Sequence, residues 1–414
     1  MKKASSLNIS YSLVSMLLWL SYSYVCGYAA AYLMKGGFSS TPVGILLAAA
    51  SLLAILLQTL AGFICDRRPR FDSRFFLCLF LMASVFFSFL LCFLFSDKVS
   101  LGICFGLLMS VQFSSATMIY ALANEYMNHY PFFRFGPARA LGSLVSALGM
   151  SIMGFILEHF APFVMPFVLL FLNLACFLIT FFLLPGKSRK KKPSPGSNDI
   201  NTATISQVSQ QESFHSSYGY PAFIRTHPQL MLLFMGMLLI YMSATTIYNF
   251  QINILEDLGG GSSELGIACA IGCISEVPFM FAFSFFASRF ISRSMVKAGA
   301  FFYFLKLGLF CFAFKVAFVY CAQILQGPSY ALLSMFAVRY VDEKTSPREK
   351  GRGQALLGMI SNGLAGIISS LVSGRMFDIL GARTTVRIWF VIAAGGFLLV
   401  LSALHPARSA KTAV

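Results

Sequence analysis

The stretch GGFSSTPVGI (36–45) returns in the second half of the chain as GGGSSELGI (259–267). Each copy lies between the first and the second long apolar block of its half. A weaker match relates RALGS (139–143) to QALLG (354–358), and each of these opens an apolar block after a basic loop. Matches at corresponding places favour an internal duplication, the pattern of architectures built from repeated halves. Chance similarity among helices rich in Gly, Ser and Ala is the alternative explanation.

The apolar residues gather in blocks that are long enough to cross a membrane. The chain is 57% hydrophobic and 11% charged, with a mean hydropathy of +0.76. Twelve blocks of about 18–25 residues match the length that a helix needs to span hydrocarbon. They are too long and too uniformly apolar for the alternating strands of a barrel. The sequence therefore predicts an all-α integral membrane fold of twelve transmembrane helices in two six-helix, pseudo-symmetric bundles.

A polar segment separates the two sets of six blocks. Residues 186–228 include the basic run SRKKKP (188–193) and continue with Ser, Asn, Gln and Thr. Such a composition cannot bury a core, so we expect this segment to be a largely disordered cytoplasmic linker. The domain prediction is an N-terminal six-helix bundle over 1–185, this linker, and a C-terminal six-helix bundle over 229–414.

The basic residues are distributed unevenly about the predicted spans. With the N-terminus inside, most of the 31 Lys and Arg residues fall in inner segments. The outer segments hold Lys35, Lys98, Lys315, Arg375, Arg383 and Arg387. The positive-inside rule then predicts a multi-pass protein of the plasma membrane (the cell inner membrane) with both termini in the cytoplasm. The net charge of +16 is explained by this topology and does not require a nucleic-acid partner.

The sequence contains no pattern typical of an enzyme or of a metal site. All ten Cys lie inside apolar blocks without a CxxC pair, and the five His lie at block ends or in loops. Neither a nucleophile–base pair nor a His/Asp cluster lies at one depth, and no GxxxxGK[ST] loop is present to bind ATP. We therefore expect a protein that is not an enzyme, has no cofactor and no metal, and is not an ATP-driven pump.

Two opposite charges, Glu276 and Lys306, lie near the middle of neighbouring apolar blocks. An ionised group at membrane depth is costly and usually faces a partner or a watery cavity. Three interpretations of Glu276 remain open: it pairs statically with Lys306, it contacts the solute, or it takes up and releases a proton. The two charges indicate a polar path through the protein.

The six-plus-six arrangement and the loop after the second block resemble the major facilitator superfamily. The segment GFICDRRPR (62–70) is similar to that superfamily's GxxxD-(R/K)-x-G-(R/K)-(R/K) loop, with a proline in place of the usual glycine. The resemblance implies alternating access between two halves, with this loop as a gating element. Its expected gating residues are Gly62, Asp66, Arg67 and Arg70. A solvated charged loop is the simpler interpretation of the same residues.

The start of the fifth block resembles one branch of that superfamily. FGPARALGS (135–143) is similar to the FGxAR…G element of the oligosaccharide:proton symporters, the relatives of lactose permease. The resemblance implies that Arg139 binds solute together with the acid that ends the fourth block, for which Glu125 is the candidate. The alternative role of Arg139 is a basic residue that only sets topology. Glu276 matches the branch's glutamate of span eight, and Lys306 lies near its span-nine arginine.

Several positions differ from that branch. Gln323, Gln326 and Ser329 align with its ionisable residues of span ten, and Asn362 aligns with a lysine of span eleven. A neutral amide cannot take up and release a proton near pH 7. The scaffold therefore matches, whereas the usual proton switch is missing, and Glu276 is the acid left near the middle of a predicted span.

Polar side chains on several predicted spans can share a central cavity. A helical wheel places Tyr24 and Tyr28 on one face of the first span. The candidate solute-binding residues are Tyr28, Glu125, Arg139, Tyr248, Asn249, Gln323, Gln326 and Asn362. The alternative for each of them is a hydrogen bond between helices.

The expected function is secondary active transport of a small polar solute by alternating access, as proton-coupled uptake by a monomer in the lipid bilayer. Within the branch that the chain resembles, the solute is a sugar. Sodium held by neutral oxygens is the alternative coupling ion. The sequence leaves two other functions open: export of amphipathic compounds, and a non-transporting membrane sensor on the same scaffold.

Overall fold

The computed structural model describes residues 2–67, 71–95, 97–186, 220–346 and 349–405, and the regular secondary structure among these residues consists of helices joined by short turns. The first half contains α1 (Lys2–Gly27), α2 (Ala29–Lys35), α3 (Ser40–Arg67), α4 (Ser73–Leu91), α5 (Lys98–His129), α6 (Phe135–His159) and α7 (Val164–Leu183). The second half contains α9 (Tyr220–Thr226), α10 (Pro228–Asn249), α11 (Gln251–Asp257), α12 (Ser262–Phe281), α13 (Phe283–Arg289), α14 (Ser292–Cys311), α15 (Val316–Ile324), α16 (Gln326–Lys344), α17 (Lys350–Gly358), the π-helix η2 (Met359–Leu364) and α18 (Ala365–Ala403).

The helices agree with the predicted number of spans. Among the described residues, 11 helical segments are long and apolar enough to cross a membrane, and the last of them has 54 residues. That segment is not continuous, because Gly381 adopts φ 74° and ψ 174° inside α18. A positive φ is a conformation that glycine adopts readily and other residues avoid. The kink divides the last segment into two spans, which confirms the all-α membrane fold with twelve spans.

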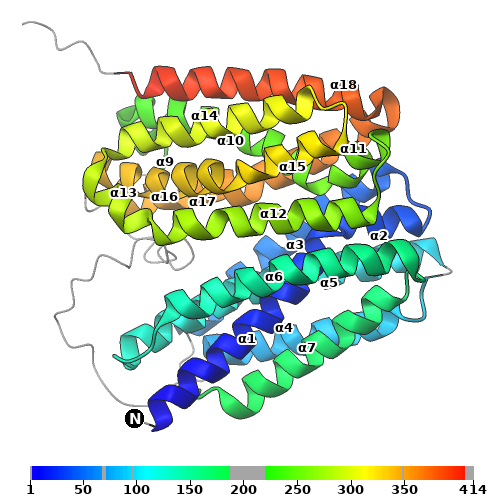
Figure 1. Ribbon diagram of the computed structural model, residues 1–414. Helices are drawn as coiled ribbons and strands as arrows, with labels where there is room; N and C mark the ends of the chain where they lie inside the picture. The colour runs from blue at the N-terminus through cyan, green and yellow to red at the C-terminus, as the bar shows by residue number, and fades with distance from the viewer. Residues whose placement is uncertain (1, 68–70, 96, 187–219, 347–348, 406–414) are drawn as a thin grey trace, which may run out of the picture.

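The chain forms two helical bundles that meet at one end (Figure 1). We call the end at which the N-terminus lies the terminal end; there Asn8 donates a hydrogen bond to the carbonyl of Phe132, with 3.1 Å between the two atoms. We call the opposite end, where α2 and α11 lie, the far end. Figure 1 shows the bundles closest at the far end and farther apart toward the N-terminus.

The predicted linker is only partly described. Residues 187–219 lie outside the described residues, so the disorder predicted for them stays a prediction. The last part, from Tyr220, is helical rather than disordered, because α9 carries an apolar anchor: Phe223 is 1% exposed. His227 follows α9 and lies 3.5 Å from the carboxylate of Glu349. The pKa of Glu349 is held below its usual value, chiefly by the hydrogen bond that Ser346 donates.

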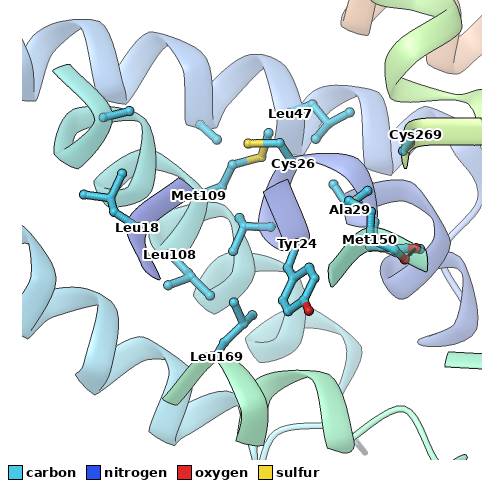
Figure 2. Packing of buried hydrophobic residues seen from close by; sticks show 14 of the residues in the cluster. Leu18, Tyr24, Cys26, Ala29, Leu47, Leu108, Met109, Met150, Leu169 and Cys269 are labelled. Carbon is cyan, nitrogen blue, oxygen red and sulfur yellow. Dashed lines mark hydrogen bonds between the residues drawn. The ribbon is translucent and has the colours of Figure 1, made fainter. Parts of the chain in front are cut away.

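The first bundle combines an apolar core with one buried polar network. Figure 2 shows Leu18, Leu108 and Leu169, from α1, α5 and α7, within the cluster of buried hydrophobic residues. Large apolar side chains also cover the outside of the helices, as expected for surfaces that face lipid. In that setting helices are held together by close packing and by hydrogen bonds between them.

The polar network joins four helices of the first bundle. Asn173 Oδ1 accepts hydrogen bonds from Ser21 (2.9 Å) and Gln112 (2.8 Å), and its Nδ2 donates to Ser88 (3.3 Å). All four side chains are fully buried. Because a buried polar group without a partner is costly, this network fixes α1, α4, α5 and α7 relative to one another.

Asn173→Leu should destabilise the protein by about 1–3 kcal/mol, since the amide of Gln112 would lose a buried partner. The measurement is the thermal unfolding midpoint of the purified protein in detergent. Ser51→Ala is the matched control, because the Ser51 hydroxyl donates only to Leu47 of its own helical turn among the described contacts. An unchanged midpoint for Asn173→Leu would show that the network does not hold the bundle together.

Candidate functional site: a polar cavity closed at the far end

A cavity of about 250 Å³ lies in the second half and reaches the first half through Ser23 of α1 and Met150 of α6. Its remaining lining comes from α10, α12, α14, α15, α16, α17 and η2. It contains four tyrosines, two glutamines and two opposite charges: Tyr241, Tyr248, Tyr303, Tyr330, Gln323, Gln326, Glu276 and Lys306. Aromatic faces beside a few polar groups are typical of a site for a small organic molecule.

The amide of Gln326 lies between the two charges. Its Oε1 accepts a hydrogen bond from Lys306 Nζ at 2.5 Å, and its Nε2 donates one to Glu276 Oε1 at 2.9 Å. Lys306 is only 7% exposed and needs such a partner, because an unpaired charge at membrane depth is costly. In this structure Glu276 and Lys306 are therefore not bonded to each other directly. Each is bonded to the neutral amide of Gln326 between them.

A break in the tenth span positions the two glutamines. α15 ends at Ile324 and α16 begins at Gln326, so Gln323 and Gln326 flank the break. The backbone N–H of Gly327 donates to Ser275 Oγ at 2.9 Å, and a Cβ on Gly327 would lie only 2.0 Å from the carbonyl oxygen of Ser275. Only glycine permits this approach, which holds the break against α12 beside Glu276.

The other predicted residues of this region have different surroundings. Tyr248 and Gln323 line the cavity, and Gln323 also donates to Gln251 Oε1 at 2.9 Å. Tyr28 donates to the carbonyl of Met150, and Asn249 donates to Ser370 Oγ at 2.9 Å, so both connect helices. The predicted residue Asn362 lies in η2, and its side chain is outside the described part of the structure.

Arg139 and Glu125 have separate partners in the structure. The guanidinium of Arg139 donates to Tyr120 (3.0 Å) and Ser143 (2.6 Å) and lies 4.1 Å from the ring centre of Trp19. Glu125 instead accepts a hydrogen bond from Ser73 at 2.7 Å. Neither contact involves a solute, so the predicted binding role of each residue stays a prediction.

The contact of Glu125 belongs to a clasp at the terminal end of the first bundle. We call clasp a Ser-Arg pair that opens a helix and bonds to the ends of two others. Here the hydroxyl of Ser73, the first residue of α4, bonds to Glu125 at the end of α5. The next residue, Arg74, donates to the backbone carbonyl of Thr180 at 3.2 Å and to that of Phe181 near the end of α7.

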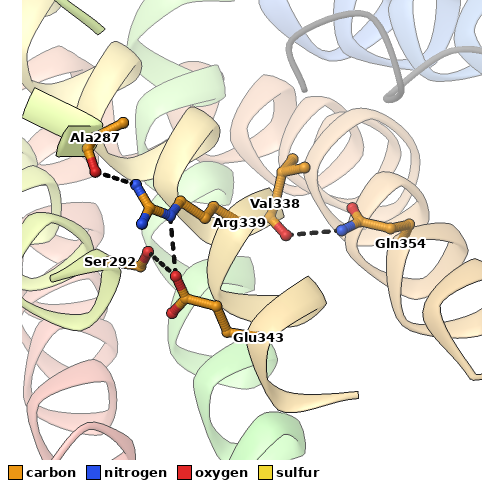
Figure 3. A network of polar contacts seen from close by, with 6 residues as sticks. All are labelled: Ala287, Ser292, Val338, Arg339, Glu343 and Gln354. Carbon is orange, nitrogen blue, oxygen red and sulfur yellow. Dashed lines mark hydrogen bonds and ion pairs between the residues drawn. The ribbon is translucent and has the colours of Figure 1, made fainter. Parts of the chain in front are cut away.

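The second bundle repeats the clasp. Ser292, the first residue of α14, donates to Glu343 of α16 at 2.8 Å, and Arg293 donates to the carbonyl of Leu404 after α18. Figure 3 shows Ser292 and Arg339 on the same carboxylate of Glu343. The two clasps indicate that Glu125 and Glu343 hold corresponding helix ends. A Ser-Arg pair at the start of span three and of span nine was the available sequence signal, and it was missed.

The predicted gating loop is described only in part. Gly62, Asp66 and Arg67 lie in the last turns of α3, and the guanidinium of Arg67 lies 4.1 Å from the ring centre of Phe63. Asp66 and Arg67 are exposed. Arg70 lies outside the described residues, so the gating role of this loop stays a prediction.

At the far end, each copy of the repeated stretch donates backbone hydrogen bonds to a carboxylate of the other half. Asp378 of α18 accepts hydrogen bonds from the backbone N–H groups of Ser40 (2.8 Å) and Thr41 (2.7 Å), which open α3. Glu158 of α6 accepts one from the N–H of Ser263 (2.7 Å), which opens α12. A carboxylate satisfies the free N–H groups of a helix start and interacts favourably with its dipole.

Glycines bring the same helices into close contact. A Cβ on Gly44 of α3 would lie 3.1 Å from the Cα of Gly374 in α18 and 2.2 Å from a backbone carbonyl of that helix. A Cβ on Gly154 of α6 would lie 3.1 Å from the Cα of Gly266 in α12 and 2.4 Å from a backbone carbonyl there. The spacings GxxxD (374–378) and GxxxE (154–158) were the missed sequence signals. These contacts close the far end between the halves.

A sequence profile of the MFS_1 like family matches residues 8–388. The chain belongs to this family. It is a family of membrane transporters in the major facilitator superfamily, which confirms the predicted superfamily and the prediction that the chain is not an enzyme. The match does not test the narrower resemblance to the oligosaccharide symporters.

Two bacterial relatives share part of the sequence. The uncharacterized transporter YwbF of Bacillus subtilis (strain 168) is 25% identical over 159 residues, which is 38% of this chain and 40% of that protein. The nucleoside permease NupG of Escherichia coli (strain K12) is 23% identical over 143 residues, which is 33% of this chain and 34% of the permease. The matches thus span less than half the length of these relatives.

Solved transporters share the fold over nearly the whole chain. The nucleoside transporter NupG matches with a TM-score of 0.71 at 18% identity, covering 97% of this chain and 98% of that one. The human organic anion transporter MFSD10 (TETRAN) matches with a TM-score of 0.62 at 15% identity, covering 96% and 99%. At such identities the likeness establishes the fold alone.

Glu125→Ala should lower the free energy of unfolding by about 1 kcal/mol, because Ser73 would lose its acceptor. The measurement is the thermal unfolding midpoint, which should fall. Glu343→Ala should cost at least as much, since it also removes the ion pair with Arg339 at 2.9 Å. Solute affinity, measured by equilibrium binding, should stay unchanged in Glu125→Ala. Lost affinity at an unchanged midpoint would instead support the role in solute binding.

Gly154→Leu should keep the far end open, because the added side chain collides with α12. The measurement is the reaction of Cys273, which lines the cavity, with a membrane-impermeant maleimide applied at the far end, in a variant without the other cysteines. We expect a several-fold faster reaction. Gly366→Leu is the matched control, since a Cβ there meets no atom within 4 Å. Equal rates in both variants would contradict closure by these glycines.

Proposed function

We propose that this protein is a secondary active transporter that takes up nucleosides, or solutes closely related to them, together with protons by alternating access. The observation that carries the proposal is the cavity, which is lined by four tyrosines, two glutamines and a pair of opposite charges. The contacts between the two halves at the far end close the protein on that side. The name of the partial relative NupG supports nucleosides as the solute. The sugar predicted from the resemblance is thereby replaced by a solute that pairs a sugar with an aromatic base.

The dimensions and lining of the cavity favour a small polar solute. About 250 Å³ is below the roughly 300–1,000 Å³ typical of sites for drug-sized molecules. Tyrosine rings offer faces on which a base stacks, and the amide of Gln323 adds a polar group that can hydrogen-bond to the solute. Such a lining counts against the alternative of an exporter of large amphipathic compounds.

The contacts at the far end support alternating access. Two carboxylate contacts and two glycine contacts close that end, and none of them is covalent, so the halves can part there. We propose that both termini are cytoplasmic, which makes the closed far end the external one. We propose further that the protein acts as a monomer in the plasma membrane and that the solute passes through the cavity.

Glu276 is the proposed coupling group. It lines the cavity, accepts a hydrogen bond from the amide of Gln326, and is attracted by the positive charges of Arg139 and Lys306. A carboxylate that binds a proton no longer attracts the lysine, so protonation changes what the cavity binds. Sodium held by neutral oxygens is the alternative coupling ion.

Glu276→Gln should abolish accumulation of radiolabelled uridine driven by a pH gradient in liposomes, while exchange without a gradient continues. Exchange survives because it bypasses the return of the empty, deprotonated carrier. The control is the double variant Glu276→Gln with Lys306→Gln, which removes both charges that meet at the amide of Gln326. Accumulation restored in the double variant would refute proton coupling at Glu276, and absence of exchange in the wild type would refute transport of this solute.

A further inference from the structure

We propose that the solute is recognised by a hydrogen-bond donor and an acceptor on neighbouring positions of its ring, which replace the amide of Gln326 between Lys306 and Glu276. This inference rests on the proposed function and deepens it. It names the chemical feature by which the cavity recognises the solute. It also makes Gln326 a competitor of the solute for the position between Lys306 and Glu276.

The two flanking charges impose a fixed polarity on whatever lies between them. A lysine ammonium only donates hydrogen bonds and a carboxylate only accepts them. The occupant must therefore turn an acceptor to Lys306 and a donor to Glu276. The amide of Gln326 does this with Oε1 at 2.5 Å from Nζ and Nε2 at 2.9 Å from the carboxylate.

The same arrangement of atoms occurs on the edge of a pyrimidine base. Uridine carries a C=O next to an N–H, and cytidine carries a ring nitrogen next to an amino group. Either edge offers one acceptor and one donor, as a carboxamide does. Exchange of the side-chain amide for such an edge conserves both hydrogen bonds, so each buried charge has a partner both before and after the solute binds.

The place of Gln326 in the fold makes it the group at the site that an incoming solute can displace most easily. Gln326 is the first residue of α16, at the break of the tenth span, and it lines the cavity. The neighbouring Gln323 is held by its bond to Gln251 at 2.9 Å. A ring that enters between the charges lies among Tyr303 and Tyr330, whose side chains line the same cavity.

The first test compares three ligands on the purified wild-type protein by isothermal titration calorimetry. 3-Methyluridine lacks the N–H donor, and we expect it to bind at least about tenfold more weakly than uridine, because a hydrogen bond to a charged group is lost. 5-Methyluridine is the matched control, since its methyl group is elsewhere on the ring and leaves the edge intact. It should bind about as tightly as uridine.

The second test uses Gln326→Ala. Removal of the internal competitor should leave uridine affinity equal to or higher than that of the wild type, because the solute no longer displaces a side chain. A clear loss of affinity in this variant would mean that Gln326 holds the solute directly, and the displacement would be wrong. Thermal unfolding confirms that the variant is folded.

The outcomes separate this inference from the proposed function. Equal binding of uridine and 3-methyluridine overturns the inference and leaves nucleoside transport standing. Absence of binding by uridine, and by cytidine and inosine titrated in the same way, overturns the proposed function itself. The ligand comparison needs no variant, so it decides the matter even where Gln326→Ala does not fold.

Discussion

The interaction on which the site depends is the amide bridge from Lys306 through Gln326 to Glu276. A lysine that is 7% exposed among apolar helices must have an acceptor, and a carboxylate at the same depth must have a donor. One glutamine supplies both, across three helices, α12, α14 and α16. Two local features place this amide between the charges: the helix break before Gln326 and the close contact of Gly327 with α12.

Duplication explains most of the other polar contacts. Each bundle ties its own terminal end with a Ser-Arg clasp, and each half offers a helix start that receives a carboxylate of the other half. The clasps lie within the bundles, whereas the carboxylate contacts lie between them. This division is what alternating access requires, because bundles that stay intact can separate and rejoin at their shared surface. The cavity breaks the symmetry, since its charged groups come from the second half.

The sequence was sufficient for the fold, and only partly for the site. Hydrocarbon thickness sets the length of apolar blocks, so twelve spans could be counted in advance. The helix α9 was missed because a single apolar anchor, Phe223, is too weak a signal inside a polar segment. Glu276 and Lys306 were recognised by their depth in the spans, and Gln323 and Gln326 by their alignment with the ionisable residues of span ten in the symporter branch. Their connection was not, because it depends on how three helices pack.

Glu125 illustrates the opposite case. Its place at the end of span four predicted a partnership with Arg139, yet the structure joins it to Ser73. A helix end lies near several other helix ends, and position along the chain does not say which of them is the partner. The same holds for Glu158 and Asp378, whose role depends on the register between helices of different halves.

The most direct measurement is an experimental structure of the protein with 5-bromouridine bound, in which the bromine locates the base by its anomalous scattering. The account predicts the base edge between Lys306 Nζ and the carboxylate of Glu276, with the side chain of Gln326 turned away. An amide of Gln326 still bonded to both charges, with the base bound elsewhere, would contradict it.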